Sequence, residues 1–173
     1  KELSYSATLS STFTKTDATS QLELQTAYAP SYAAAGPNTL IDKIRGSNDF
    51  RTGDWQGFQG KDVVAIVSFT DARTINSLGA SWLKDLNSWI FEPSQIVIET
   101  SNDGITYHAA AEFVIRTATK ETEEKGLGSV VKSVVIDKVK FIRYTIRNQG
   151  VCPNWHLGAG NPTWIFLDEL IFD

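Results

Sequence analysis

The stretch FIRYTIR, residues 141–147, alternates between apolar and polar side chains. Ile142, Tyr144 and Ile146 carry the apolar side chains, and Arg or Thr stands at each position between them. A repeat of two residues is the period of a β-strand that buries one face and exposes the other to solvent. The stretch therefore predicts a half-buried β-strand.

The same signal continues toward both ends of the chain. Val63, Ala65, Val67 and Phe69 fall on one face of an expected strand. Further strands are expected over residues 75–83, 96–98, 130–136 and 164–172. No segment keeps a helical period over three turns, and no alternation of strand and helix is present. The pattern predicts an all-β fold, an antiparallel β-sandwich or barrel.

One turn is marked by its own residues. Asn102-Asp103-Gly104 separates two β-prone runs. Asp and Gly both tolerate a positive φ angle, so Asp-Gly between two such runs predicts a β-hairpin.

Length and composition limit the domain organisation and the class of partner. The chain has 173 residues, which we expect to form one domain over residues 26–173 after a Ser- and Thr-rich extension or edge strand over residues 1–25. The net charge is −4 and the lysines and arginines are scattered, which disfavours a nucleic acid partner. No apolar run approaches the ~20 residues that span a membrane, so we expect no membrane insertion. Cys152 is the single cysteine, which excludes an internal disulfide.

Two long loops are unusual in their residue types. Residues 45–60 and 148–162 are polar and rich in glycine, and they contain Trp55 and Trp155. Loops of this length inside a compact domain are usually functional.

These features resemble the discoidin family, also called the coagulation factor 5/8 type C domain. Leu40-Ile41-Asp42, before the loop that reaches Trp55, is similar to the family's first loop. Ser101-Asn102-Asp103-Gly104 is similar to its Ser-x-Asp-Gly hairpin. Phe141-Ile142-Arg143-Tyr144 and Leu167-Asp168-Glu169-Leu170 are similar to its late aromatic-basic strand and its closing strand. The resemblance covers about residues 26–173 and implies an antiparallel β-sandwich of the jelly-roll type.

A narrower group is more similar still, namely the modules attached to bacterial β-N-acetylhexosaminidases, chitobiases and some α-fucosidases. The similar strings are DWQGF (54–58), NSWIFEP (87–93), CPNWH (152–156) and WIF (164–166). This resemblance implies a secreted, periplasmic or cell-surface module that acts as a monomer and has no catalytic activity. It implies that the module targets an attached glycoside hydrolase to glycans that contain galactose, fucose or N-acetylhexosamine.

Aromatic and polar residues in the loops are the candidates for a sugar site. A pyranose stacks its C–H face on a flat ring, and its hydroxyl groups bind planar or charged partners. The candidates for ligand binding are Trp55, Asp85, Asn87, Trp89, Trp155 and His156. For each tryptophan the alternative is a structural role at the end of the sandwich, and for Asp85 and Asn87 it is a solvated turn.

A structural Ca²⁺ ion is the expected cofactor. The resemblance implies a metal between the first loop and the closing strand, where Asp42 and Glu169 stand, with Asp49 as a third candidate. Hard cations take several oxygen ligands, so carboxylates suit this site. The family usually has Gly after the Asp of the first loop, whereas this chain has Lys43. The alternative is a turn that Asp42 caps and a Glu169 that only accepts backbone hydrogen bonds.

Catalysis is not indicated by any residue pattern. A glycosidase needs two facing carboxylates, and no motif pairs the loop acids Asp54 and Asp85. No Ser-His-Asp, metal-His or phosphate-loop pattern is present. The other function that we consider is a structural or interaction module that packs against a neighbouring catalytic domain and has no ligand of its own.

Overall fold

The computed structural model describes residues 18–121 and 125–173, and nearly all of their regular structure is β-strand. The strands are β1 (Ser20–Leu24), β2 (Gln56–Gln59), β3 (Val63–Asp85), β4 (Gln95–Ser101), β5 (His108–Val114), β6 (Lys125–Arg147) and β7 (Trp164–Phe172). Four three-residue 3-10 helices lie between them: η1 (Pro30–Tyr32), η2 (Thr39–Ile41), η3 (Phe50–Thr52) and η4 (Leu86–Ser88). Within the described residues, no helix is long and apolar enough to cross a membrane.

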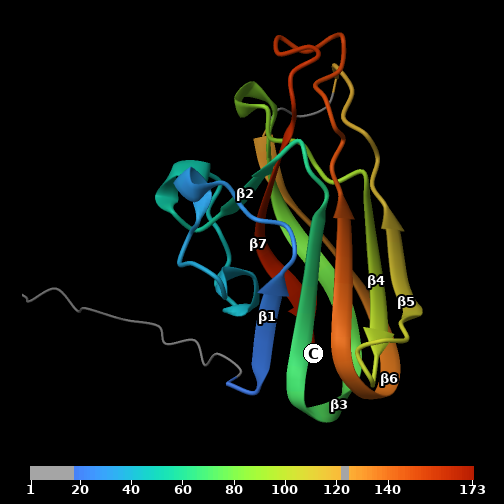
Figure 1. Cartoon of the computed structure of the whole chain (residues 1–173). Coiled ribbons are helices and arrows are strands. Elements are labelled where there is room, and N and C mark those ends of the chain that lie inside the picture. The colour runs from blue at the N-terminus through green and yellow to red at the C-terminus, as the bar shows by residue number, and fades with distance from the viewer. Residues whose placement is uncertain (1–17, 122–124) are drawn as a thin grey trace, which may run out of the picture.

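The strands form one antiparallel sheet that is bent into two layers (Figure 1). The strand order is β2-β7-β3-β6-β4-β5, and β1 pairs with β3 outside this path. The front layer contains β1, the first half of β3, the second half of β6, β4 and β5. The back layer contains β2, β7, the second half of β3 and the first half of β6. The predicted antiparallel β-sandwich is confirmed.

The bend is made by β3 and β6, which stay paired from one layer into the other. Their register shifts between Ser68 and Ser77, and Lys138 on β6 has a φ angle of 59°. Irregularities of this kind bend a strand pair and increase its twist. The sequence predicts a separate strand over residues 75–83, whereas the structure continues β3 through the bend. Residues 70–74 (TDART) show no strand period, although Arg73 among them is still paired with Val139 of β6.

The core lies between the two layers. Val63, Ala65, Val67 and Phe69 are all buried on the inner face of β3, as predicted. Ile142, Tyr144 and Ile146 of β6 are fully buried beside them. The Tyr144 hydroxyl donates a hydrogen bond to the carbonyl oxygen of Ile171 at 2.8 Å, which ties β6 in the front layer to β7 in the back layer. Burial raises the pKa of Tyr144 well above its ordinary value, so this hydroxyl stays protonated.

Two local predictions are refined by the structure. The hairpin between β4 and β5 is present, but its connection runs from residue 102 to residue 107. Gly104 has a φ angle of 75°, whereas Asp103 is not in the left-handed region. Instead, the Asp103 carboxylate accepts the backbone N–H groups of Ile105 and Thr106, both at 2.8 Å. At the N-terminal side, Leu22 and Leu24 of β1 pack against the core, within the region expected to be an extension or edge strand.

Candidate functional site

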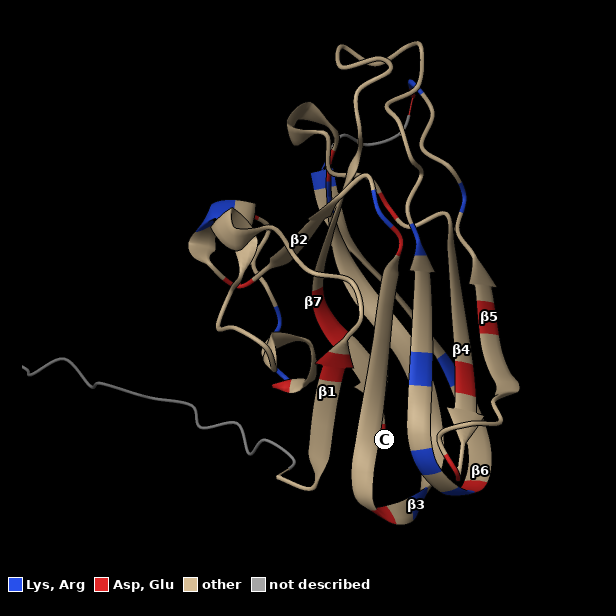
Figure 2. Cartoon of the chain, in the orientation of Figure 1, with Lys and Arg blue, Asp and Glu red and all other residues tan. Residues whose placement is uncertain are grey.

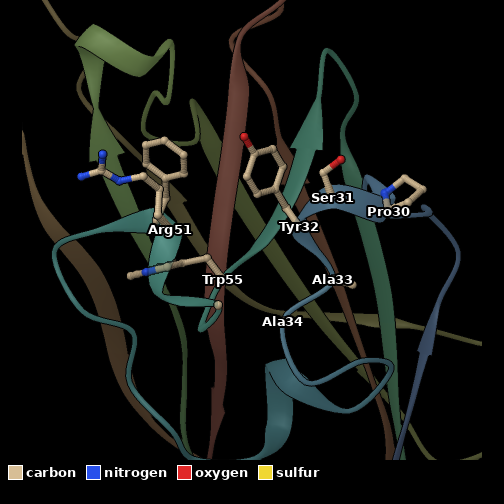
Figure 3. Close-up of a pocket in the computed structure, with 9 residues that line it drawn as sticks. Pro30, Ser31, Tyr32, Ala33, Ala34, Arg51 and Trp55 are labelled. Atoms are coloured by element: carbon tan, nitrogen blue, oxygen red, sulfur yellow. The ribbon is translucent and has the colours of Figure 1, made fainter.

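η1 and η3 protrude next to β2 on the side of the sandwich (Figure 1). A cavity lies between them (Figure 3). We call it the side groove. It is open to solvent and has a volume of about 620 Å³, which is within the usual size range of small-molecule sites. Its lining residues are Pro30, Ser31, Tyr32, Ala33, Ala34, Phe50, Arg51, Gly53 and Trp55.

Tyr32 forms one wall of the side groove. Its ring packs edge to face against Phe166 at 4.8 Å, Trp164 at 5.2 Å and Phe50 at 5.9 Å between ring centroids. A side chain at Gly57 of β2 would come within 2.9 Å of Tyr32 Cβ, so the absence of a side chain there allows η1 to lie against the sheet. Figure 3 shows the Tyr32 ring between Ser31 and Arg51. The wall is therefore a half-buried aromatic ring held in a fixed orientation.

The loop behind Tyr32 is fixed by a buried amide. Gln56 of β2 is fully buried, and its Nε2 donates hydrogen bonds to the carbonyl oxygens of Gly36 at 2.7 Å and Ala33 at 3.4 Å. The backbone N–H of Ala29 also donates to the carbonyl oxygen of Gly57 at 2.8 Å. These bonds join the segment that carries η1 to the sheet, so the groove wall has a rigid support.

Trp55 lies in the core and not on the surface. Its side chain is 1% exposed, and its Nε1 donates to the carbonyl oxygen of Ser47 at 3.0 Å. It packs with Leu83, Ile90 and Phe166 in a small hydrophobic cluster. A ring buried to this extent has no open face for a sugar. We therefore assign Trp55 to the support of the side groove, which is the structural alternative considered for it above.

Asp49 and Arg51 form an ion pair at the edge of the groove. The Asp49 carboxylate caps η3 by accepting the backbone N–H of Arg51 at 3.0 Å. The same carboxylate binds the guanidinium through Nε at 2.8 Å and Nη2 at 2.9 Å. Hydrogen bonds from Arg51 lower the pKa of Asp49 to about 2, so it is ionised at neutral pH. Because Arg51 binds both carboxylate oxygens, we do not retain Asp49 as a calcium ligand.

The other residues predicted to bind a sugar lie at the end of the sandwich, in or next to η4 and in residues 150–163. We call this region the loop crown; it is at the top of Figure 1. Asp85 at its base is 6% exposed and pairs with Lys125, with 3.3 Å between the carboxylate oxygen and Nζ. Asn87 is exposed on η4. Trp89 has a φ angle of 63° and packs against Gly158, where a Cβ atom would come within 2.7 Å of the indole.

His156 joins the two parts of the loop crown. Its Nδ1 accepts the backbone N–H of Gly158 at 3.0 Å, so Nε2 must carry the proton that is shared with the carbonyl oxygen of Leu86 at 2.7 Å. Both ring nitrogens therefore have protein partners, and His156 stabilises the crown instead of offering a nitrogen to a ligand. Trp155 beside it is 37% exposed and packs against Phe91 and His156. Among Trp55, Trp89 and Trp155, the three tryptophans predicted to bind a sugar, Trp155 is the most exposed to solvent.

The two regions are adjacent but separate. Asp85 at the base of the crown is close enough to act on the charge of Arg51 in the groove. The sequence did not identify Tyr32, Phe50 or Arg51, although the last two lie in the long loop over residues 45–60 that it marked as functional. Tyr32 lies among Pro and Ala residues that gave no signal beyond an irregular segment.

The expected calcium ligands Asp42 and Glu169 are close together under the first loop. Burial is the main cause that raises the pKa of Glu169 to about 8. The charges of Asp42 and Asp168 contribute to this rise, and the hydrogen bond from the Lys43 N–H opposes it. Burial also raises the pKa of Asp42. The acidic residues of β7 are red in Figure 2. A cation that displaced the Glu169 proton would relieve the repulsion between these carboxylates, and carboxylate oxygens suit calcium. Among residues 18–121 and 125–173, however, no three His, Cys, Asp or Glu side chains form a metal-binding group, so carbonyl oxygens and water would have to complete the site.

Lys43 does not disturb the backbone of this loop. It has a φ angle of 64°, the left-handed conformation that Gly adopts most easily. This conformation costs a non-glycine residue about 1 kcal/mol. The Lys43 N–H donates to Glu169 Oε2 at 2.9 Å, which holds the residue in place. The adjacent Asp168 is fully buried and accepts from the Gly46 N–H, Arg45 Nε and the Ser81 hydroxyl, which fixes the start of the long loop.

Comparison with known proteins identifies the fold. No protein-family model matches the chain, and no curated protein matches it. Among solved structures, an F5/8 type C domain from Bacteroides fragilis aligns with a TM-score of 0.54 at 11% identity, over 89% of this chain and 91% of that domain. A family 32 carbohydrate-binding module from a family 31 glycoside hydrolase of Clostridium perfringens aligns with a TM-score of 0.53 at 16% identity, over 87% and 89% of the two chains.

A second Clostridium perfringens module of family 32, solved in complex with GalNAc-β-1,3-galactose, aligns with a TM-score of 0.52 at 11% identity, over 89% and 94%. The fold of this chain is therefore the discoidin-type β-sandwich, as the sequence motifs predicted. At these identities the comparison establishes the fold alone.

Proposed function

We propose that this chain is a non-catalytic carbohydrate-binding module whose ligand lies in the side groove. The observation that carries the proposal is the open groove of about 620 Å³, with the aromatic Tyr32 in its wall and Arg51 at its edge. An aromatic face takes the C–H side of a pyranose, and guanidinium N–H groups bind its hydroxyl oxygens. The carbohydrate-binding modules that share this fold support the same class of ligand.

The proposal includes a targeting role. One module of this fold belongs to a glycoside hydrolase, and we propose that this chain likewise acts as a monomer that holds an attached hydrolase, chitobiase- or hexosaminidase-like, on a glycan outside the cell. The ligand would contain galactose, fucose or N-acetylhexosamine. An open groove orders few groups on binding and buries little ligand surface, so we expect dissociation constants of about 10 µM to 1 mM.

The test is calorimetric titration of the chain with glycans of these three sugars, combined with the variant Tyr32→Ala. Loss of the ring should weaken binding about 5- to 30-fold, because stacking on one aromatic ring contributes roughly 1–2 kcal/mol. Tyr107→Ala is the matched control, because Tyr107 is a half-buried tyrosine outside the groove that packs under Arg143. Trp155→Ala tests the loop crown as the site, since Trp155 is its partly exposed ring.

Two results would contradict the proposal. Absence of binding to every glycan at millimolar concentration would favour the interaction module without a ligand. Binding that Trp155→Ala abolishes and Tyr32→Ala leaves unchanged would move the site to the loop crown.

We also propose that Ca²⁺ binds at Asp42 and Glu169. The support is the pair of crowded carboxylates beside Lys43 and the left-handed backbone of Lys43. Its place, under the loop that leads to η3, gives the ion a structural role and no contact with the sugar.

A further inference from the structure

The charge of Arg51 is the feature of the side groove that bears on which sugars can enter. Among the residues that line the groove, Arg51 is the one with a charged side chain, and that side chain is 72% exposed. A guanidinium binds a carboxylate more strongly than a hydroxyl group, because two of its N–H groups match the two carboxylate oxygens. Taken alone, Arg51 would therefore favour acidic sugars.

Asp49 changes this expectation. Its two oxygens hold the guanidinium through Nε at 2.8 Å and Nη2 at 2.9 Å, the bidentate geometry that an incoming carboxylate would need. The same Asp49 is fixed by its role as the cap of η3, because it also accepts the backbone N–H of Arg51 at 3.0 Å. A ligand cannot displace it without opening η3. Arg51 thus keeps N–H groups for hydroxyl oxygens, while its charge is already balanced.

The charged residues around the Asp49–Arg51 pair do not make the side groove positive. Lys125 acts on Asp49 and Asp85 acts on Arg51, and these two residues form an ion pair with each other at 3.3 Å. Asp54 is close by, since its Oδ2 accepts the Thr52 hydroxyl at 2.6 Å. Within each of the ion pairs Asp49–Arg51 and Asp85–Lys125 the two charges cancel, and Asp54 adds a negative charge. A ligand that carries a carboxylate would therefore meet no net positive charge here.

We propose that Asp49 is a specificity-determining residue that restricts the side groove to neutral sugars and excludes uronic acids and other acidic sugars. This inference rests on the proposed function, because it assumes that the side groove binds a sugar. It assigns to Asp49 a role that is separate from the metal site for which the sequence made it a candidate. Asp49 acts through Arg51, by occupying the donors that a sugar carboxylate would use.

The experiment compares sugars that differ only at C6. The chain is titrated with methyl β-galactoside and methyl β-galacturonide, and with methyl β-glucoside and methyl β-glucuronide. For the better bound pair, the neutral sugar should bind at least about fivefold more tightly than its uronide. Asp49→Asn should reduce this ratio to about one or reverse it, mainly because it strengthens binding of the uronide.

A stability measurement and two further variants make the result specific. Asn is itself a good N-cap, so Asp49→Asn should keep η3, which an unchanged thermal midpoint would verify. Arg51→Gln should have the opposite effect to Asp49→Asn and lower the affinity for the uronide further, because it leaves the Asp49 carboxylate without its partner. Asp62→Asn is the matched control, because Asp62 forms an ion pair with Arg147 at 2.6 Å outside the groove; it should leave the ratio unchanged.

The outcomes separate this inference from the proposed function. If no neutral sugar binds, the proposed function fails and the inference fails with it. If neutral sugars bind and Tyr32→Ala weakens them, but the uronides bind equally well or Asp49→Asn leaves the ratio unchanged, the inference alone is overturned.

Discussion

Replacing Glu169 by Gln should make the calcium-free protein more stable at alkaline pH. Burial, followed by the charges of Asp42 and Asp168, raises the pKa of Glu169 from an ordinary value near 4.5 to about 8. Between these two values the folded protein holds a proton that the unfolded chain releases. The stability that this proton contributes is complete below about pH 4.5 and is lost as the pH rises through about 8.

The magnitude follows from the size of this pKa change. One pKa unit corresponds to about 1.4 kcal/mol, so the rise from 4.5 to about 8 sets an upper limit of about 5 kcal/mol on the stability that is lost at high pH. Solvent reaches the half-buried Asp42 and the exposed Lys43, and it screens part of the repulsion. We therefore expect wild type to lose about 3 kcal/mol more than Glu169→Gln between pH 5 and pH 9. The amide resembles the protonated acid and can still accept the Lys43 N–H, so the two proteins should be similar at pH 5.

The assay is urea denaturation followed by tryptophan fluorescence at pH 5, 7 and 9 with a calcium chelator present. Glu112→Gln is the control, because Glu112 is an exposed glutamate on β5. Parallel pH profiles for wild type and Glu169→Gln would refute the reasoning. In millimolar Ca²⁺ the order at pH 9 should reverse, since the ion stabilises wild type by mass action and the variant has lost a ligand. If chelation leaves wild type unchanged, the calcium proposal fails and the pH result still stands.

Three other substitutions test the packing described above. Tyr144→Phe removes the hydroxyl that binds the Ile171 carbonyl oxygen and should cost about 1–2 kcal/mol in urea denaturation; no change would mean that this bond between the layers is dispensable. Gly158→Ala places a Cβ within 2.7 Å of the Trp89 indole and should lower the thermal midpoint and shift tryptophan emission, whereas unchanged emission would contradict the close packing. Asp103→Ala removes the acceptor of two backbone N–H groups. Because these bonds lower the pKa of Asp103 to about 2, its stabilisation is present above pH 4 and is lost as the pH falls toward 2, so the thermal midpoints of variant and wild type should converge there.

Most of the fold was predictable because burial leaves a period of two in the sequence. Ile142, Tyr144 and Ile146 are fully buried on β6, as the alternation in FIRYTIR required. The continuity of β3 through the bend was not predictable from the same signal. At a bend the side chains face solvent on both sides, so the pairing there depends on the partner strand and leaves no periodic mark.

The candidate site was only partly predictable, because loop conformation decides which side chains are exposed. Trp55 and Trp155 looked alike among glycines and polar residues, yet one is 1% exposed and the other 37%. His156 looked like a ligand residue, but backbone groups of both crown segments satisfy its ring. Tyr32 had no distinguishing neighbours, and its role arises from contacts with Phe166 and Trp164 more than 130 residues away.

The pairing of β3 with β6 through both layers couples the unfolding of the two layers. Because both strands pass through both layers, neither layer can detach while the other stays intact: separation would have to break a hydrogen-bond ladder that belongs to both. Amide protons of β3 in the front layer and in the back layer should therefore exchange with solvent in the same opening event. The sandwich should resist a pulling force as a single mechanical unit, without a weaker layer that yields first.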